Sequence, residues 1–333
     1  MKRLLVIVFT LTAILAAGYL ALRRADIPYD TLEKVYANQD SQFLTLNGEA
    51  RLHYRDVGPR DAPAIVLVHG FSASLHTWED WATNLKQDYR VISLDLPGHG
   101  LTRCPDVSEM GIAHFVSVVD QALSTLNAEK FTLVGNSMGG ATAWNYTLAH
   151  PEKVDALVLV DASGWPEAAE DSESEPFVFK LLANPLARSV MKDLDLSSLI
   201  RSGLEDSFTD QSLVTDEMVK RYASLGRAPC HRQAILNLMS GENPRPIASK
   251  ETLASITAPT LILHGEDDNL VPVGDATRFA EAIPNAQTII YENVGHLPQE
   301  EVATQSVSDL RDFLTNAVFK PVITAPEATD SNE

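Results

Sequence analysis

The longest uninterrupted run of apolar residues lies at the N-terminus. From Leu4 to Leu22 the chain holds nineteen residues without a charge. As a helix this run would be about 28 Å long, close to the hydrocarbon thickness of a bilayer. Basic pairs flank it, Lys2-Arg3 before and Arg23-Arg24 after. We predict a transmembrane anchor in residues 1–24.

A cleaved signal peptide is the alternative interpretation of this run. Such a peptide has a shorter apolar region of about 7–15 residues and small residues before the cleavage site. Ala13, Ala16 and Ala17 are candidates for that site, but the run continues to Leu22 and ends on two arginines. We therefore favour a single-pass membrane protein. Counting the α-amine, positive charge is slightly greater before the run than after it, so we expect the rest of the chain outside the cytoplasm.

Short apolar runs alternate with helical patterns after a lead-in over residues 25–48. Six runs rich in β-branched residues are typical of buried parallel strands. They are Ala64–Val68, Val91–Leu94, Phe131–Val134, Ala156–Val160, Thr260–Leu263 and Thr288–Tyr291. Arg51–Arg55 alternates polar and apolar residues and suits an outer strand. Apolar stripes between Ile112 and Leu126 and between Val302 and Leu314 predict helices. This order predicts an α/β fold, a mostly parallel sheet with helices on both faces.

Residues 166–250 interrupt the alternation of strands and helices. The segment contains no convincing strand, and it begins with an acidic cluster between Glu167 and Glu175. Helical patterns follow at Phe177–Leu182, Val190–Ile200, Asp216–Leu225 and His231–Met239. We interpret the segment as a helical cap inserted between two parts of the core, residues 49–165 and 251–320. Residues 321–333 are predicted to be a disordered tail.

Composition and charge narrow the class of protein. The 333 residues are 45% hydrophobic and 21% charged, as in ordinary globular domains. With 45 acidic and 26 basic residues the net charge is −19, so the surface repels phosphate backbones and nucleic acid is not an expected partner. The two cysteines, Cys104 and Cys230, allow at most one disulfide and cannot build a zinc site.

A glycine-rich turn follows the strand that ends at Val134. The sequence Gly135-Asn136-Ser137-Met138-Gly139-Gly140 leads from this strand into a helical pattern, which is the G-x-S-x-G arrangement of a nucleophile elbow. A serine on so sharp a turn takes strained backbone angles, and the flanking glycines leave the space that it needs. We predict that Ser137 is a nucleophile. The N–H of Met138, at the helix start, would point at a developing oxyanion.

A nucleophilic serine needs a histidine that takes its proton. Of nine histidines, His296 is the best candidate because it follows the last strand and precedes the last helix. That position lies at the same edge of a parallel sheet as Ser137. His69 precedes a glycine after an early strand, which suggests a backbone role there. In that role the N–H of Phe71 completes the oxyanion hole.

The histidine in turn needs a carboxylate that orients it. The segment after Thr260–Leu263 offers two adjacent aspartates, Asp267 and Asp268. Asp161, after the preceding strand, is a third candidate. We favour Asp268, and the other two remain alternatives because the direction of a side chain is not readable from spacing. The chain order Ser, Asp, His is that of α/β-hydrolases.

Five motifs together resemble the α/β-hydrolase superfamily over residues 45–318. They are His69-Gly70-Phe71, the DLPGHG sequence at 95–100, the elbow at 135–140, the segment Gly265–Pro272, and Gly295-His296-Leu297-Pro298. In that family the acid follows the glycine by three positions, which favours Asp268 over Asp267. The family also implies catalysis without a cofactor, and no H-E-x-x-H, C-x-x-C or P-loop pattern suggests a metal or nucleotide.

Two branches of the superfamily compete. The anchor with HGFSAS and DLPGHG resembles membrane-anchored esterases and monoacylglycerol lipases, which implies hydrolysis of a small-molecule or lipid ester through an acyl-enzyme. The elbow helix GNSMGGATAWNYTLAHPEK and the segment DQSLVTDEM resemble meta-cleavage-product hydrolases, which cut carbon–carbon bonds. Against that branch, Ser72-Ala73-Ser74 replaces its GPG loop, Leu297 replaces its aromatic residue, and Arg221 is shifted from its substrate-binding arginine. We expect an esterase, with the carbon–carbon hydrolase as the alternative.

Overall fold

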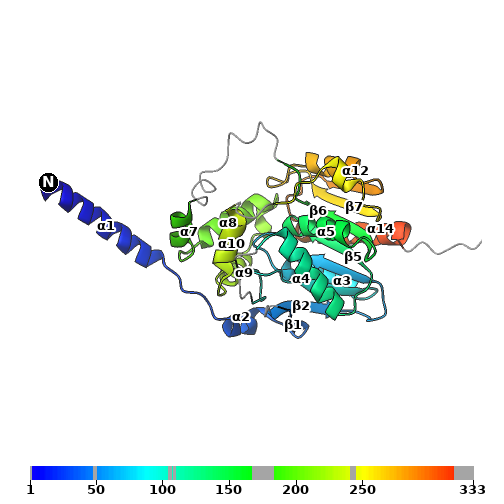
Figure 1. Ribbon diagram of the computed structural model, residues 1–333, viewed down its shortest axis with the longest axis horizontal. Helices are drawn as coiled ribbons and strands as arrows, with labels where there is room; N and C mark the ends of the chain where they lie inside the picture. The colour runs from blue at the N-terminus through cyan, green and yellow to red at the C-terminus, as the bar shows by residue number, and fades with distance from the viewer. Residues whose placement is uncertain are drawn as a thin grey trace, which may run out of the picture.

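The N-terminal apolar run forms a single long helix. The computed structural model describes residues 2–47, 51–103, 107, 110–166, 184–240 and 245–318. In it the apolar run is helix α1, Lys2–Leu22. It extends away from the rest of the molecule (Figure 1). Its Leu5–Leu22 window has a mean hydropathy of 2.4, none of it is buried, and it is long and apolar enough to cross a membrane.

An eight-stranded sheet forms the centre of the fold. The strands are β1 Ser41–Thr45, β2 Arg51–Val57, β3 Ala64–Val68, β4 Arg90–Leu94, β5 Phe131–Asn136, β6 Val154–Val160, β7 Thr260–Gly265 and β8 Ala286–Tyr291. Their order in the sheet is β1-β2-β4-β3-β5-β6-β7-β8. Strand β2 is antiparallel to both of its neighbours, and all pairs from β4 to β8 are parallel. The prediction of a mostly parallel sheet is confirmed.

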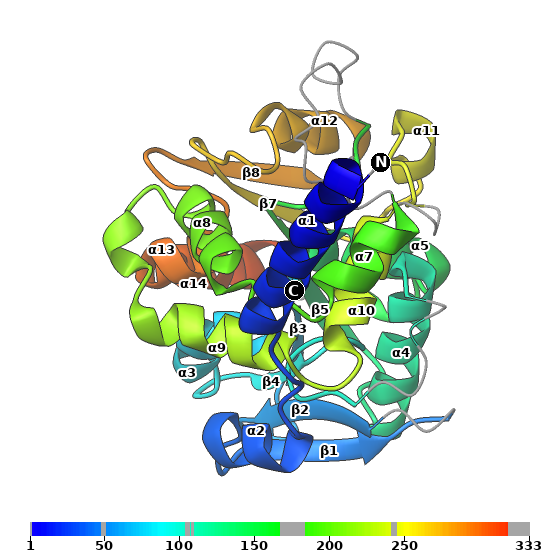
Figure 2. The same ribbon diagram turned by 90° about the vertical axis from the view of Figure 1, so that its left-hand side faces the viewer.

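Helices cover both faces of the sheet (Figure 2). On one face α4 (Ile112–Thr125), α5 (Met138–Ala149) and α12 (Gly274–Ala282) bury large side chains, among them Phe115, Trp144 and Phe279. On the other face α3 (Glu79–Leu85) and α14 (Ala303–Phe313) bury Trp81 and Leu310. Burying each such side chain contributes about 1.5–3 kcal/mol, so these two layers hold the sheet rigid.

The remaining helices are short. Before β7 the chain forms α2 Tyr29–Tyr36, the 3₁₀ helix η1 Leu75–Trp78 and α11 Lys250–Leu253. After β8 it forms α13 Pro298–Glu301 and the π-helical turn η4 Leu314–Val318. Between β6 and β7 lie α7 Pro185–Met191, α8 Ser197–Ser207, η3 Gln211–Leu213, α9 Asp216–Gly226 and α10 His231–Met239. These five lie within residues 166–250, the segment that we interpret as a cap and call the cap below.

The end of α1 is bonded to the cap. The N–H of Arg24 donates to the Asp193 carbonyl at 2.8 Å, and the N–H of Asp195 donates to the Leu22 carbonyl at 2.9 Å. The Tyr19 hydroxyl donates to the Asp193 carboxylate at 2.8 Å, and Arg24 forms an ion pair with Asp195 at 3.1 Å. The segment between α7 and α8 is therefore fixed against the C-terminal end of the apolar helix.

Two strands differ from the hydropathy pattern. Residues 41–45, which we assigned to the lead-in, form the edge strand β1. None of its five side chains is fully buried. Because β1 covers that edge, β2 lies second in the sheet rather than outermost. Strand β8 is not buried as predicted: it is the opposite edge, and Ile290 is 40% exposed. An edge strand needs only one covered face, so its composition is a weak signal.

Some predicted segments differ in extent or lie outside the described residues. The helix predicted at Val190–Ile200 is split between α7 and α8, and the break provides the residues that bond to α1. The pattern at Phe177–Leu182, the acidic cluster, the tail at 321–333 and Cys104 are outside the described residues. Cys230 carries a free thiol.

Replacing Phe115 by alanine tests the packing of α4 on the sheet. The ring is fully buried, so Phe115→Ala should lower the free energy of unfolding by about 3–5 kcal/mol. Ser124→Ala, on the exposed side of the same helix, should change it by less than about 0.5 kcal/mol. Guanidinium denaturation of both variants in detergent measures the difference. Equal midpoints would contradict this packing.

Candidate active site

Ser137 occupies a strained turn between β5 and α5. Its backbone angles are φ 53° and ψ −117°, a conformation that few non-glycine residues adopt. The neighbouring glycines are required by contact: a Cβ on Gly135 would lie 2.1 Å from the Gly139 carbonyl oxygen, and one on Gly139 would lie 2.2 Å from the Val68 carbonyl oxygen. The serine is therefore held at the carboxyl end of β5 by backbone packing on both sides.

The loop after β3 passes beside this serine. A Cβ on Gly70 would lie only 3.2 Å from Ser137 Cβ, so the backbone leading to Phe71 runs next to the hydroxyl. Met138 is the first residue of α5, and N–H groups in a first helical turn have no intrahelical acceptor. Both residues thus lie at the serine, and their role as oxyanion donors remains our prediction.

His69 holds the loop from behind. Its Nδ1 lies 2.7 Å from the Gly70 carbonyl oxygen, and its Nε2 lies 3.0 Å from the Leu96 N–H, which donates to it. Burial lowers the pKa of His69, so the ring is neutral with its proton on Nδ1. This agrees with the structural role that the sequence suggests for it.

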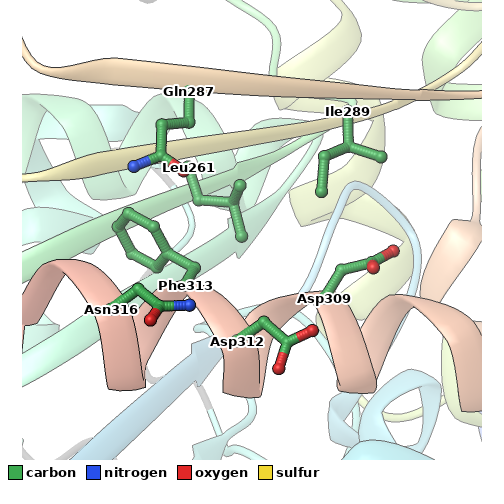
Figure 3. Close-up of a pocket in the computed structure, with 7 residues that line it drawn as sticks. All are labelled: Leu261, Gln287, Ile289, Asp309, Asp312, Phe313 and Asn316. Carbon is green, nitrogen blue, oxygen red and sulfur yellow. The ribbon is translucent and has the colours of Figure 1, made fainter.

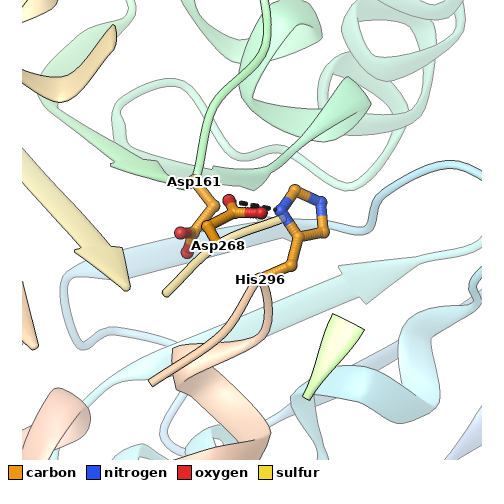
Figure 4. Close-up of side chains that lie close together, drawn as sticks. All are labelled: Asp161, Asp268 and His296. Carbon is orange, nitrogen blue, oxygen red and sulfur yellow. Dashed lines mark hydrogen bonds and ion pairs between the residues drawn. The ribbon is translucent and has the colours of Figure 1, made fainter. Parts of the chain in front are cut away.

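His296 and Asp268 lie together in the loops that follow β8 and β7, at the carboxyl ends of the strands (Figure 4). The Nδ1 of His296 donates to Asp268 Oδ2 at 2.7 Å. Asp268 Oδ1 accepts the N–H groups of Leu270 and Val271 at 2.7 and 3.0 Å. Burial would raise the pKa of Asp268, but the charge of His296 and these hydrogen bonds outweigh it and lower the pKa. Asp268 is therefore an anion held in one orientation behind the imidazole.

The two alternative aspartates have different surroundings. The side chain of Asp267 is exposed, and its backbone N–H donates to the Val294 carbonyl. Asp161 is completely buried, and its ligand atoms lie within 4.8 Å of those of Asp268 and His296. Only Asp268 has a hydrogen bond to the imidazole among the residues described here.

Two contacts of the histidine loop were not predicted. Asn136, inside the elbow motif, donates from Nδ2 to the carbonyl oxygens of His296 and Val160, each at 3.2 Å. The N–H of His296 donates to the carbonyl of Ser207, the last residue of α8, at 2.8 Å. Asn136 belongs to the elbow motif, but the motif does not indicate which groups its side chain contacts. The sequence does not indicate the backbone carbonyl of Ser207 as an acceptor either.

The residue after the histidine is part of the cap's apolar core. Leu297 is buried against Leu204, Phe208, Val214 and Val219. The departure at this position from the carbon–carbon hydrolase pattern therefore has a packing role, since a leucine joins α8 and α9 to the loop that carries His296.

A second set of hydrogen-bonded Ser, His and Asp side chains lies away from the elbow. His53 Nδ1 lies 2.7 Å from Asp95 Oδ2, and its Nε2 lies 2.9 Å from Ser41 Oγ. Asp95 also accepts the N–H groups of Leu75 and Leu101, and Ser41 stands at the start of the edge strand β1 rather than on a strained turn. These hydrogen bonds join β1 and β2 to the segments that carry Leu75 and Leu101. Ser41 is therefore a matched control for Ser137.

Asp161, Asp268 and His296 are also the one group of described residues whose atoms are close enough to hold a metal ion. Both oxygens of Asp268 already accept hydrogen bonds, and Asp161 Oδ1 accepts the Gly265 N–H at 2.9 Å. This donor set fits a hydrogen-bonded relay better than a metal site. A separate hollow between β8 and α14 (Figure 3) is lined by Leu261, Gln287, Ile289, Asp309, Asp312, Phe313 and Asn316 and contains none of the candidate residues.

Comparison with known proteins identifies the family. Residues 63–303 match the family model described as alpha/beta hydrolase fold. This chain belongs to the α/β-hydrolase family. The predicted fold class is thereby confirmed, and the protein is a hydrolase of that fold.

The relatives of this hydrolase belong to more than one branch. It is 31% identical to a 2-hydroxy-6-oxononadienedioate/2-hydroxy-6-oxononatrienedioate hydrolase of Comamonas testosteroni, over 83% of this chain and 96% of the relative. It is 28% identical to a 2-hydroxy-6-oxo-6-phenylhexa-2,4-dienoate hydrolase of Burkholderia cepacia with the same coverages. Among solved structures it resembles a membrane phospholipase A, described as a bacterial virulence factor, with a TM-score of 0.70, 26% identity, and coverage of 94% of this chain and 98% of that one.

Exchanging single aspartates tests which of them orients the histidine. Asp268→Asn should lower kcat severely, up to about 10⁴-fold, because the amide favours the wrong imidazole tautomer. Asp267→Asn should leave kcat within about twofold, because this side chain is exposed and has no hydrogen bond to His296 among the described residues. Steady-state hydrolysis of a chromogenic ester by both variants gives the comparison. A larger loss in Asp267→Asn would exclude Asp268 as the orienting acid.

Proposed function

We propose that this hydrolase cleaves carboxylic esters of lipids, with Ser137 as nucleophile, His296 as general base and Asp268 as the residue that orients it. The observation that carries the proposal is the hydrogen bond from His296 to buried Asp268 at the sheet edge where the strained Ser137 lies. Strained serines beside an oriented imidazole are the arrangement of acyl-transfer catalysis.

The reaction proceeds through an acyl-enzyme. Ser137 Oγ attacks the ester carbonyl carbon, and its proton passes to His296 Nε2. The negative charge on the carbonyl oxygen is stabilised by the N–H groups of Phe71 and Met138, each worth about 3–4 kcal/mol in comparable sites. The leaving alcohol takes the proton from His296. Water then attacks the acyl group with His296 again as base, which releases the acid and restores Ser137.

A lipid substrate is supported by the position of α1. The apolar helix is bonded at its end to the cap, through Arg24 with Asp193 and Asp195. If α1 is a membrane anchor, these bonds hold the cap at the bilayer surface, with the catalytic domain outside the cytoplasm. Among solved structures, the match to the membrane phospholipase A also covers 94% of this chain, against 83% for a meta-cleavage product hydrolase.

Carbon–carbon hydrolysis is the second candidate, and the curated relatives favour it. Both named relatives act on dienoates or dienedioates, which carry carboxylates. In this chain Arg221, on α9, would be the residue that stands in for their substrate-binding arginine, from which it is shifted. Burial raises the pKa of Glu300 to about 7, and the positive charge of Arg221 opposes that rise. The charge of Arg221 also lowers the pKa of Glu79, so this arginine acts on two acidic groups of the protein.

A substrate series separates the two reactions. An apolar acyl site gains about 0.8 kcal/mol per buried methylene, so kcat/KM should rise up to about fourfold per CH₂ until the site is full. We expect this rise for neutral esters of increasing chain length, and slow turnover of a carboxylate-bearing dienone measured beside them. Faster turnover of the dienone with no rise along the esters would promote the carbon–carbon hydrolase.

Labelling with a fluorophosphonate tests the nucleophile. Ser137→Ala should abolish labelling and reduce ester hydrolysis by several orders of magnitude, because only an activated serine reacts. Ser41→Ala, which removes the hydroxyl of the second set of Ser, His and Asp side chains, should label like the wild type. Labelling retained in Ser137→Ala and lost in Ser41→Ala would reverse the assignment.

A further inference from the structure

Asp161 is a buried carboxyl group that the proposed reaction does not use. It follows β6, has no exposed surface, and has a left-handed φ of 44°. Its Oδ1 accepts the Gly265 N–H at 2.9 Å. Its Oδ2 is buried, and no donor among the described residues hydrogen-bonds to it. A buried oxygen without a partner is costly, so this atom needs a proton or a donor.

Asp161 lies close to the carboxylate that orients His296. One ligand atom of each aspartate and of the imidazole lie within 4.8 Å of one another, and Figure 4 shows both aspartates on the side of the ring that bonds to Asp268. Asp268 Oδ1 is occupied by two backbone N–H groups, whereas Oδ2 accepts one hydrogen bond, from His296. Since a carboxylate oxygen accepts two hydrogen bonds, Asp268 Oδ2 has room for a second donor.

The other ionisable groups around Asp161 do not supply a compensating charge. His264 Nε2, on β7, lies 3.6 Å from both carboxyl groups, but it hydrogen-bonds the Val271 carbonyl at 3.0 Å, and burial lowers its pKa. Glu301, on α13, adds negative charge. Tyr291, at the end of β8, is neutral, because burial and its bond to Asp309 raise the pKa of its hydroxyl.

Two adjacent buried carboxyl groups cannot both ionise without such a charge. Burial and the charge of Asp268 hold the pKa of Asp161 well above its ordinary value. Asp268 stays ionised because it faces His296 and two N–H groups, so the proton resides on Asp161.

We propose that Asp161 is a positioning residue that keeps its proton and donates it from Oδ2 as a hydrogen bond to Asp268 Oδ2, the same oxygen that accepts from His296. This inference rests on the proposed function in one respect: it takes Asp268 as the acid that orients His296. The donated hydrogen bond fixes the rotation of the Asp268 carboxylate and moderates the negative charge that the imidazole meets. A third carboxyl group thus acts through the second and does not touch the substrate.

Two replacements of Asp161 separate a neutral donor from an anion. Asp161→Asn keeps an acceptor for Gly265 and a donor for Asp268, and asparagine tolerates a left-handed φ. It should retain kcat within about threefold, with the acidic limb of the kcat/KM profile unmoved. Asp161→Gly tolerates the same backbone but removes the donor. It should lose about 10- to 100-fold in kcat, the effect of a lost hydrogen bond to a charged group.

The opposite results would overturn the proposal. If Asp161 were an anion, Asp161→Asn would remove a negative charge near the imidazole, and the acidic limb would fall by about one pH unit or more. Full activity in Asp161→Gly would show that no positioning bond exists.

Infrared difference spectroscopy tests the proton directly, independently of catalysis. Wild type minus Asp161→Asn, on the full-length protein in detergent near neutral pH, should show the C=O stretch of a protonated carboxyl group. A carboxylate band in its place would refute the proposal even if ester hydrolysis proceeds as described. If instead the protein hydrolysed no ester, the infrared band would still decide the state of Asp161.

Discussion

The site depends on backbone segments that approach more closely than any side chain permits. A Cβ on Gly139 would lie 2.2 Å from the Val68 carbonyl oxygen, and one on Gly135 would lie 2.1 Å from Gly139. This approach locks β3, β5 and α5 into one arrangement and forces Ser137 into its left-handed conformation. Such strain costs about 1–3 kcal/mol and persists only where the surroundings determine it. The buried sheet and its two helical layers provide those surroundings, so the conformation of the serine is a property of the whole core.

A similar close approach joins the cap to the histidine loop. A Cβ on Gly295 would lie 2.5 Å from the Ser207 carbonyl oxygen, and the same carbonyl accepts the His296 N–H. Ser207 ends α8, and Ser197, which begins it, stands two positions after Asp195, the residue bonded to the end of α1. One helix of eleven residues therefore connects the apolar N-terminal helix with the loop of the proposed base. The hydrogen bonds at the two ends of α8 thus join α1 and the loop of His296 to the same helix.

Sequence patterns predict those parts of the molecule whose periodicity and packing coincide. The buried strands and the elbow at Ser137 follow from runs of β-branched residues and from glycines at fixed spacing. The edge strand β1 does not, because pairing of its backbone rather than burial of its side chains creates it. Spacing also offers Asp161, Asp267 and Asp268 as similar candidates, since it carries no information on direction. Only the folded loop shows one exposed, one bonded to His296, and one buried behind it.

The residues around Ser137 do not by themselves choose between an ester and a carbon–carbon bond, because relatives of both kinds share the fold. Which bond is cleaved depends on which substrate reaches the serine and on whether the charges of the protein attract or repel that substrate. A net charge of −19 repels a dicarboxylate at long range, and the charge of Arg221 already acts on the pKa values of Glu79 and Glu300. A neutral acyl chain meets no such repulsion and gains stabilisation with each methylene that leaves water. If α1 is a membrane anchor, its bonds to the cap act in the same direction, because a bilayer concentrates the long-chain esters that gain most from burial.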